Sequence, residues 1–258
     1  YHPDTGTLFA SWLSTEANEA NHIKRDTPVM VVIGNPPYAA GSSNKGKWIT
    51  DLLEKYKAGV NDINKNALSD DYVKFIRLGH YFVEKNGEGI LAYISNNSFL
   101  DGSTHRQMRK ELLSTFDKIF ILNLRGDLKR IDASLNDDKD ENVFDIQQGV
   151  SINIFVKNTK RTATKATLSY CDYFGTRESK YKRLTDNHLE TIDWQILEPD
   201  SEYAFFMPKD FSSKKSFDEL IPLNDLFKVI GGGIKFRKDN LLVKNHFSAQ
   251  DVEKMLAD

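Results

Sequence analysis

Between residues 28 and 111, short apolar runs alternate with segments of helical periodicity. The run Val29–Ile33 is continuous and lies between a proline and a glycine, which is typical of a strand covered on both faces. Further strands are expected at residues 89–95, 119–124 and 166–173. Strands that alternate with helices predict a βαβ sheet in an α/β fold rather than a β-sandwich.

Helices are predicted between these strands. Apolar residues recur at helical spacing from Trp48 to Tyr56. A second helix is expected to begin at Ser69, whose side chain can cap free N–H groups, and to end at Gly87. Ser103 is expected to cap a third helix.

The region after residue 124 has a different pattern. Residues 127–141 are highly charged, which predicts a solvated loop. Residues 150–156 alternate apolar and polar side chains, and no apolar helical stripe separates them from the preceding strand. We therefore expect an antiparallel strand there. Beyond residue 157 the chain is polar and irregular, and residues 203–207 and 226–230 are interpreted as parts of a second unit.

Composition narrows the classes of function. The chain has 258 residues, with 35 Lys and Arg against 37 Asp and Glu, which excludes a histone-like basic protein but not a local basic groove. Cys171 is the only cysteine, so an intramolecular disulfide and a cysteine-based zinc cluster are excluded, and we expect no metal site. No apolar run approaches the roughly 18 residues that span a bilayer. We expect a cytoplasmic protein with no membrane partner.

The candidate chemistry lies in Asn35, Pro36, Pro37 and Tyr38, directly after the first strand. Ligands of open α/β sheets bind at the carboxyl ends of strands. An amine on an aromatic base is a poor nucleophile because its lone pair is delocalised, and a site that accepts both N–H hydrogens directs that lone pair toward an electrophile. The Asn35 side chain and the rigidly held Pro36 carbonyl offer two such acceptors, and Tyr38 can stack on a planar base.

Residues 32–38 resemble the catalytic motif of S-adenosylmethionine-dependent amino-methyltransferases, above all the adenine-N6 DNA methyltransferases. The resemblance implies that Asn35 and Pro36 bind the target amine, that Tyr38 stacks on the flipped adenine, and that Asn35 and Pro37 also contact the cofactor. Residues 72–84 and 90–99 resemble the helix and strand that follow this motif. The run 143–150 resembles a later motif, in which Phe144 would pack against the extruded adenine.

The resemblance extends, over residues 4–157 and more weakly 231–235, to the type ISP restriction-modification enzymes. These large chains join a nuclease, a helicase-like motor, a methyltransferase and a target-recognition domain. The resemblance implies an α/β fold with a partial Rossmann-like methyltransferase sheet and an antiparallel last strand. It divides the chain into the C-terminal half of the catalytic domain (residues 1–160), a connecting strand and linker (161–200) and the beginning of a target-recognition domain (201–258). It also implies double-stranded DNA as partner, and nuclease and helicase-like domains in the parent protein.

One departure from the family concerns the cofactor. The family binds S-adenosylmethionine through a glycine-rich turn upstream of the Asn-Pro-Pro-Tyr strand, and the residues before Asn35 contain no such turn. We therefore expect the cofactor to be bound mainly by residues outside this chain, and the isolated fragment to be inactive.

Three lysines are candidates for contacts with DNA phosphates. Lys45 and Lys47 lie in the segment 41–48, which resembles a phosphate-binding loop except that Trp48 replaces the magnesium-binding Ser or Thr. We interpret this segment as a mobile loop beside the active site. Lys235 follows three consecutive glycines. For the segment 41–48 and for the region around Lys235, the alternative is a solvated loop that does not contact DNA.

Two alternative functions stay open at this point. The same tetrapeptide serves any planar amine, so the substrate is alternatively RNA or a protein glutamine. The missing cofactor turn also permits a non-catalytic DNA-binding segment of a larger helicase or restriction protein.

Overall fold

The computed structural model describes residues 8–38, 41–60, 65–127, 140–159, 165–222 and 225, with the backbone alone at residues 8–13, 24–26 and 65. The chain divides into two compact units, residues 1–209 and residues 210–258. In the second unit the described helix is α6 (Lys214–Asp218). None of the helices in these described ranges is long and apolar enough to cross a membrane.

The first unit is built on a six-stranded mixed sheet in the order β1-β2-β4-β3-β5-β6. The strands are β1 (Val31–Gly34), β2 (Gly89–Asn96), β3 (Lys118–Arg125), β4 (Val150–Lys157), β5 (Thr167–Asp172) and β6 (Gln195–Leu197). β1 runs parallel to β2, and β3 runs parallel to β5. β4 lies between β2 and β3 and is antiparallel to both, which confirms the α/β fold with an antiparallel strand at residues 150–157.

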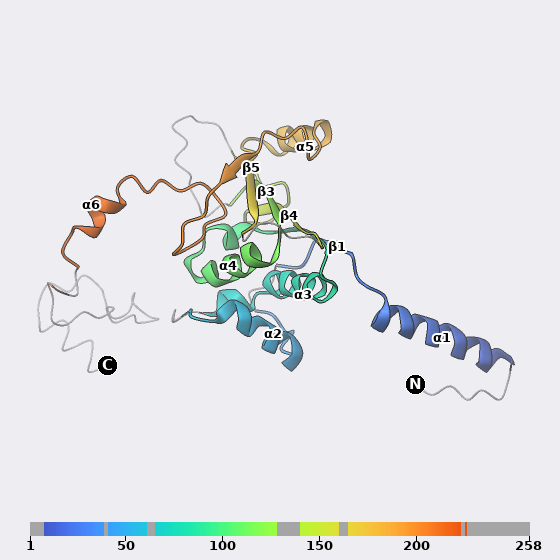
Figure 1. The fold of residues 1–258 in the computed structure, drawn as a ribbon. Coiled ribbons are helices and arrows are strands. Elements are labelled where there is room, and N and C mark those ends of the chain that lie inside the picture. The colour runs from blue at the N-terminus through green and yellow to red at the C-terminus, as the bar shows by residue number, and fades with distance from the viewer. Residues whose placement is uncertain are drawn as a thin grey trace, which may run out of the picture. The chain divides into compact units, whose positions relative to one another are not determined.

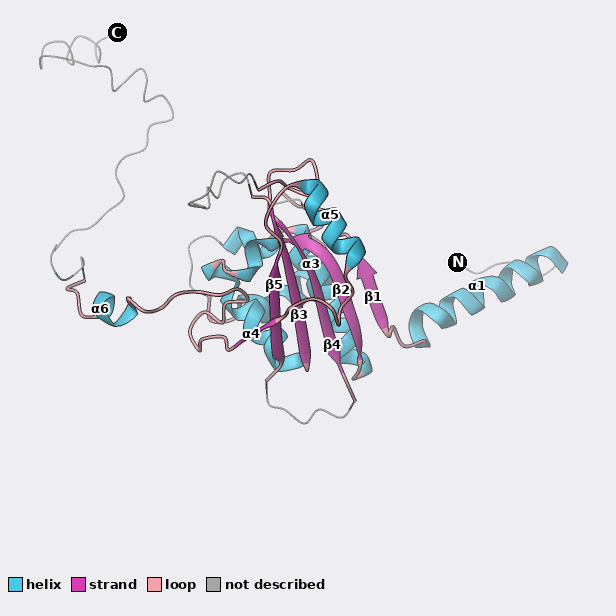
Figure 2. Cartoon of the chain, turned by 90° about the horizontal axis from the view of Figure 1, so that it is seen from above, coloured by secondary structure: helices cyan, strands magenta, loops and turns pink. Residues whose placement is uncertain are grey.

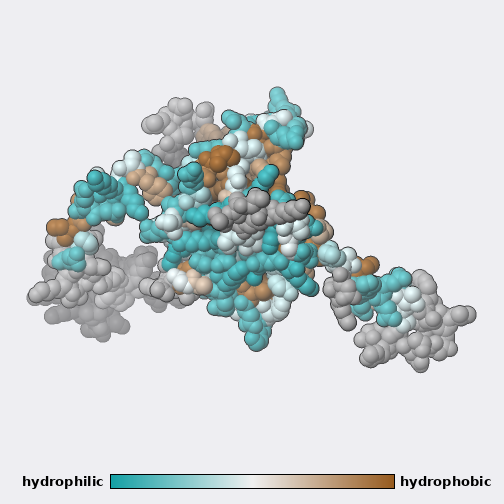
Figure 3. All heavy atoms as spheres, in the orientation of Figure 1, coloured by the Kyte–Doolittle hydropathy of each residue, from teal (hydrophilic) through white to brown (hydrophobic). Residues whose placement is uncertain are grey.

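Helices α2, α3 and α4 cover one face of the sheet, and α5 lies on the side of the other face (Figures 1 and 2). The helical elements of this unit are α1 (Leu8–Asp26), α2 (Lys47–Lys57), α3 (Asp71–Asn86), α4 (Arg106–Thr115), α5 (Arg177–Asp186) and the 3₁₀ turns Lys65–Ser69, Asn97–Leu100 and Ser103–His105. The outer surface over α2, α3 and α4 is largely hydrophilic in Figure 3, as expected of amphipathic helices.

Two helix starts differ from the sequence prediction. Asp70, not Ser69, caps α3, since its side chain accepts a hydrogen bond from the Tyr72 N–H group. Ser103 begins a 3₁₀ turn, and α4 follows it at Arg106 without a side-chain cap. The expected end of α3 is confirmed: Gly87 adopts φ 84°, the left-handed conformation that glycine reaches without strain.

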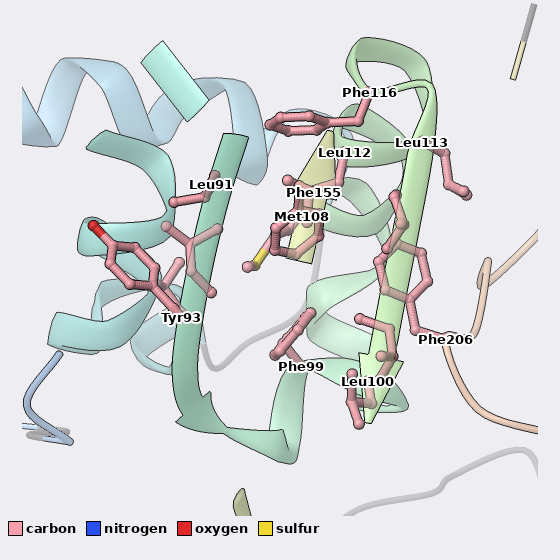
Figure 4. Packing of buried hydrophobic residues seen from close by; sticks show 14 of the residues in the cluster. Leu91, Tyr93, Phe99, Leu100, Met108, Leu112, Leu113, Phe116, Phe155 and Phe206 are labelled. Atoms are coloured by element: carbon pink, nitrogen blue, oxygen red, sulfur yellow. The ribbon is translucent and has the colours of Figure 1, made fainter. Parts of the chain in front are cut away.

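The main core lies between the sheet and helices α2 to α4. Side chains of β3 alternate between two clusters, with Ile119 and Ile121 in the main core and Leu122 and Leu124 on the opposite face. Figure 4 shows part of the main core, where aromatic and aliphatic side chains from β2, α4 and the following strands interdigitate.

Ala204 and Phe206 are buried in this main core and Met207 packs against it, although residues 203–207 were expected to start a second unit. Phe206 is fully buried, its N–H donates to the Leu100 carbonyl at 2.8 Å, and its ring meets that of Phe99 edge-on at 6.2 Å (Figure 4). The boundary expected at residue 200 therefore lies inside the first compact unit, which extends to Lys209. The expected element at 226–230 lies outside the described residues.

The first strand is not covered on both faces, as its continuous apolar run had predicted. Val31 is 57% exposed and Ile33 is 78% exposed. The reason is the topology: β1 is the edge strand of the sheet in the described part of the chain and pairs only with β2.

Candidate active site

The Asn-Pro-Pro-Tyr segment lies at the carboxyl end of β1, next to the carboxyl end of β2. The parallel register pairs Val31 with Ile90 and Gly34 with Tyr93, so the segment leaves the sheet beside Ile94. Asn35 and Pro37 are exposed, Pro36 is buried and Tyr38 is half-buried. The exposed amide of Asn35 is thus held on a rigid, partly buried turn, as a binding group for a polar ligand requires.

Tyr38 and Asn35 are directly bonded to each other. The Tyr38 hydroxyl donates to Asn35 Oδ1 at 3.0 Å and lies 3.5 Å from the Ile94 carbonyl oxygen. Desolvation by burial raises the pKa of Tyr38 to about 12, so the hydroxyl is a neutral donor at physiological pH. This bond fixes the orientation of the Asn35 amide and leaves its carbonyl oxygen a second lone pair for a ligand.

Tyr38 and Phe144 pack against the same apolar cluster, although they are far apart in the sequence. The cluster consists of Leu122, Leu124, Val143, Val150 and Tyr173, and both aromatic side chains are partly buried against it. The segment 140–149 leads into β4, whose first residue Val150 pairs with Asn96 at the carboxyl end of β2. The fold therefore brings both predicted aromatic residues to the same edge of the sheet.

Buried amide and hydroxyl groups form hydrogen bonds to one another between the strands that lead to this edge. Asn153 Nδ2 donates to Ser95 Oγ at 3.0 Å, and the Ser151 hydroxyl donates to Asn153 Oδ1 at 2.9 Å. Nearer the strand ends, Asn97 Nδ2 donates to Asn123 Oδ1 at 3.0 Å. All five residues are buried, so their mutual hydrogen bonds offset the cost of removing polar groups from water.

The three candidate lysines have different surroundings. Lys45 lines a pocket of about 540 Å³ together with Lys57 and Lys74. Lys47 is the first residue of α2 and forms an exposed ion pair with Asp51 at 2.7 Å. Lys235 lies outside the described residues. Lys45 and Lys47 are thus not equivalent, since only Lys45 contributes to the pocket.

The segment 41–46 is attached to α3 rather than unsupported. The buried Lys74 amine donates to the Asn44 carbonyl at 2.6 Å and to the Ser42 hydroxyl. Ser42 in turn donates to the Asp71 carboxylate. Trp48, predicted to stand in the place of a magnesium-binding residue, lies in α2 and packs edge-on against Tyr81 at 5.4 Å.

Residues 9–129 match the family model of the Eco57I restriction-modification methylases. The structure is similar to the ATP-dependent type ISP restriction-modification enzyme LlaBIII bound to DNA, with 26% identity and a TM-score of 0.68, over 85% of this chain and 15% of that one. It is also similar to the DrdV–DNA complex, with 27% identity and a TM-score of 0.64, over 78% of this chain and 20% of that one.

The chain carries a restriction-modification methyltransferase region similar to that of the type ISP enzymes. A nuclease-deletion mutant of the type ISP enzyme LlaGI, in complex with a DNA substrate mimic, shares the fold at 23% identity and a TM-score of 0.65, over 82% of this chain and 21% of that one. The methyltransferase region thus spans about a fifth of these solved chains or less. Among curated proteins, none matches the chain.

The two residues predicted to contact the cofactor lie on an open surface in the described part of the chain. Asn35 and Pro37 are exposed beside β1, but β1 is the edge strand, and Val31 and Ile33 expose apolar side chains there. Exposed apolar side chains at a sheet edge indicate a surface that further structure covers. These residues alone therefore do not enclose a cofactor.

Asn142 and helix α5 both contact the segment around Phe144, and neither was predicted from the sequence. Asn142 Oδ1 accepts from the Phe144 N–H group at 2.9 Å. α5 lies within residues 161–200, which were interpreted as a connecting strand and linker. Its sequence signal was a cap, because the Thr176 hydroxyl accepts from the Ser179 N–H group at 3.3 Å, but α5 lacks the apolar stripe that predicted α2, α3 and α4.

Proposed function

We propose that the protein is an S-adenosylmethionine-dependent DNA methyltransferase that modifies the N6 amine of adenine, as part of a larger restriction-modification enzyme. The observation that carries this proposal is the position of Asn35, Tyr38 and Phe144 at the carboxyl ends of the strands. Tyr38 is bonded to Asn35, and Tyr38 and Phe144 pack against the same apolar cluster. Asn35 supplies an amide acceptor, and the two aromatic residues supply rings for a base. The methylase family match supports the reaction class.

In the proposed mechanism, Asn35 Oδ1 and the Pro36 carbonyl accept the two N–H hydrogens of the adenine amine. This pairing directs the nitrogen lone pair out of conjugation, and it is strongest when the nitrogen gains positive charge in the transition state. Tyr38 stacks on the flipped base, and Phe144 packs against it. S-adenosylmethionine supplies the electrophilic methyl group. No strong general base is needed, because methyl transfer leaves the nitrogen positively charged, and this cation is acidic enough to lose one proton to water and give the neutral N6-methyl product.

Double-stranded DNA is the proposed partner. Its support is that LlaBIII, LlaGI and DrdV are all solved with DNA or a substrate mimic. Lys45, Lys47 and Lys235 are proposed contacts to phosphates, which position the duplex without reading its sequence. We further propose that the parent protein carries nuclease and helicase-like domains, that residues outside this chain bind most of the cofactor, and that the second compact unit, which begins at residue 210, leads into a target-recognition domain.

The test is methyl transfer to unmethylated double-stranded DNA by the full-length protein, with tritiated cofactor. We expect Asn35→Ala to lower the rate by about 100-fold to 1000-fold, the range seen when one charge-stabilising hydrogen-bond partner is removed. The matched control is Asn158→Ala. Asn158 is also exposed, but it follows the carboxyl end of the antiparallel strand β4, so it lies at the amino ends of β2 and β3, away from Asn35. Its rate should stay within about twofold of the unmodified protein.

Mapping the modified base completes this test. After digestion of the DNA to deoxynucleosides, all of the tritium should be found in N6-methyl-2′-deoxyadenosine. Methylation by Asn35→Ala at the normal rate contradicts the central role of the motif. Methyl transfer to RNA or to protein glutamine, with none to DNA, contradicts the proposed substrate.

A further inference from the structure

Helix α5 binds four consecutive backbone carbonyls of the segment that contains Phe144. Arg177 donates to the Asn142 carbonyl at 2.8 Å and to the Phe144 carbonyl at 3.1 Å. The Lys180 amine donates to the Glu141 carbonyl at 2.6 Å, and the Tyr181 hydroxyl donates to the Val143 carbonyl at 2.6 Å. Residues at i, i+3 and i+4 share one face of a helix, so one side of α5 is directed at residues 141–144.

Lys180 is the central contact and is fully buried. Besides the Glu141 carbonyl, its amine bonds the Leu124 carbonyl at 2.7 Å and the Asp140 carboxylate at 2.7 Å. These three acceptors use the three donors of an ammonium group. Since Leu124 lies in β3, Lys180 ties the segment to the sheet as well as to α5.

The backbone of Phe144 is bonded on both sides. Its N–H donates to Asn142 Oδ1 at 2.9 Å, and its carbonyl accepts from Arg177. Asn142 is itself held, because its Nδ2 donates to the Gly126 carbonyl at 2.9 Å and to the Gln148 carbonyl at 2.7 Å. The Phe144 ring therefore stands on a backbone with little freedom to move, beside the cluster that Tyr38 also contacts.

α5 contributes one apolar side chain, that of Leu184, to packing against the cluster that Tyr38 and Phe144 also contact. Lys180 is its only buried residue, and Tyr181 is 47% exposed. Most helices are attached to their domain by an apolar face. α5 is attached largely by polar contacts to the segment 140–149, which indicates that its position and the position of that segment are set together.

We propose that Arg177, Lys180 and Tyr181 are positioning residues that hold Phe144 in place for the flipped adenine. The inference rests on the proposed function, and it assigns a role in target-base binding to a helix from the part of the chain expected to be a linker. The three residues act through Phe144 and contact no substrate themselves. Their loss should therefore impair the binding of the extruded base and leave the acceptor groups of Asn35 and Pro36 intact.

The first arm of the test measures the segment directly, by hydrogen exchange of the full-length protein without DNA. In Lys180→Met, amides in residues 140–149 should exchange about tenfold faster or more, because a local opening becomes easier, while amides of β2 and β3 stay protected. Lys182→Met is the matched control, since Lys182 is an exposed lysine on the same helix. Equal exchange in both variants overturns the proposal.

The second arm measures methyl transfer in a double-mutant cycle. Misplacement of a binding group costs up to about 100-fold, so we expect Lys180→Met and Phe144→Ala each to lower kcat/KM for DNA by about 10-fold to 100-fold. If Lys180 acts through Phe144, the double variant is no slower than Phe144→Ala. Multiplicative losses overturn the positioning role.

A milder variant covers the case in which Lys180→Met fails to fold. Tyr181→Phe removes one hydroxyl donor and keeps the ring, and it should reproduce the faster exchange of residues 140–149 to a smaller extent. An unchanged exchange rate there contradicts the proposal. The hydrogen-exchange measurement does not depend on catalysis. If the full-length protein transfers no methyl group to DNA, the proposed function is contradicted. Hydrogen exchange alone then decides whether α5 anchors residues 140–149.

Discussion

The Tyr38 hydroxyl donates a hydrogen bond to Asn35 Oδ1 at 3.0 Å, so the two functional side chains of the motif are joined to each other. This contact separates two roles of Tyr38, namely the orientation of the Asn35 amide by the hydroxyl and stacking on a base by the ring. The two roles are separable by substitution.

Tyr38→Phe removes the hydroxyl and keeps the ring, whereas Tyr38→Ala removes both. A hydrogen bond contributes about 1 kcal/mol net, so Tyr38→Phe should slow methyl transfer by no more than about tenfold. Loss of stacking costs about 1 to 3 kcal/mol per base, so Tyr38→Ala should lose up to about 100-fold more. Steady-state rates on double-stranded DNA measure both. Equal losses in the two variants would show that the hydroxyl, not the ring, carries the function.

His105 makes the folded state sensitive to acid. Its ring is almost fully buried beside Tyr72, with 3.1 Å between the Tyr72 hydroxyl and Nε2, and burial together with the charge of Arg109 lowers its pKa from 6.5 to about 4. The unfolded chain binds a proton between these pH values that the folded chain does not. The contribution of neutral His105 to the free energy of unfolding is therefore fully present above pH 6.5. It is lost as the pH drops toward 4, and the loss is about 3 kcal/mol at most.

Urea unfolding at pH 7.5 and pH 5 measures this dependence. His105→Gln should be less stable at pH 7.5, because a shaped polar contact is lost, but should lose less stability between the two pH values than the unmodified protein. Buried His80, whose pKa is also lowered, mainly by desolvation, contributes to the remaining dependence. The same loss on acidification in both proteins would exclude His105 as a source.

Phe206 defines how far the first compact unit extends. It is fully buried, whereas Phe217 in α6 is 72% exposed. Phe206→Ala should lower the free energy of unfolding by about 3 to 5 kcal/mol, the usual cost of a large core truncation. Phe217→Ala is the matched control and should change it by less than about 0.5 kcal/mol. Urea unfolding compares the two, and similar values would contradict the assignment of residues 203–207 to this core.

Arg109 shows why these residues were assigned to the wrong unit. Its fully buried guanidinium donates to the carbonyls of Phe99 and Gly102 and also to those of Tyr203 and Ala204. An arginine in an amphipathic helix is ordinarily a solvated residue, so nothing in the local pattern signals a bond to a segment about 95 residues away. The apolar run at residues 203–207 was recognised, but its partner was not.

The pattern of apolar residues was sufficient to predict elements that depend only on neighbouring residues. The runs at residues 89–95, 119–124 and 150–156 all form strands, and the lack of an apolar helical stripe in the sequence before residue 150 was enough to predict that β4 is antiparallel. An apolar run did not predict how exposed the side chains of its strand are. Val31 and Ile33 look like a fully covered strand in sequence and lie at an exposed sheet edge in the structure, because coverage depends on neighbours distant in the chain.

The sequence by itself determined the order of the main strands and helices between residues 29 and 173 and the position of Asn35, Pro36, Pro37 and Tyr38 at the end of a strand, since backbone propensity and apolar periodicity act over a few residues. Only the tertiary structure decided that Phe144 meets Tyr38 on one apolar cluster, and that α5 holds the Phe144 segment. The first relationship depends on packing between residues far apart in the chain. The second rests on hydrogen bonds to backbone carbonyls, which every residue carries alike, so no side-chain pattern records which carbonyls a lysine or arginine will reach.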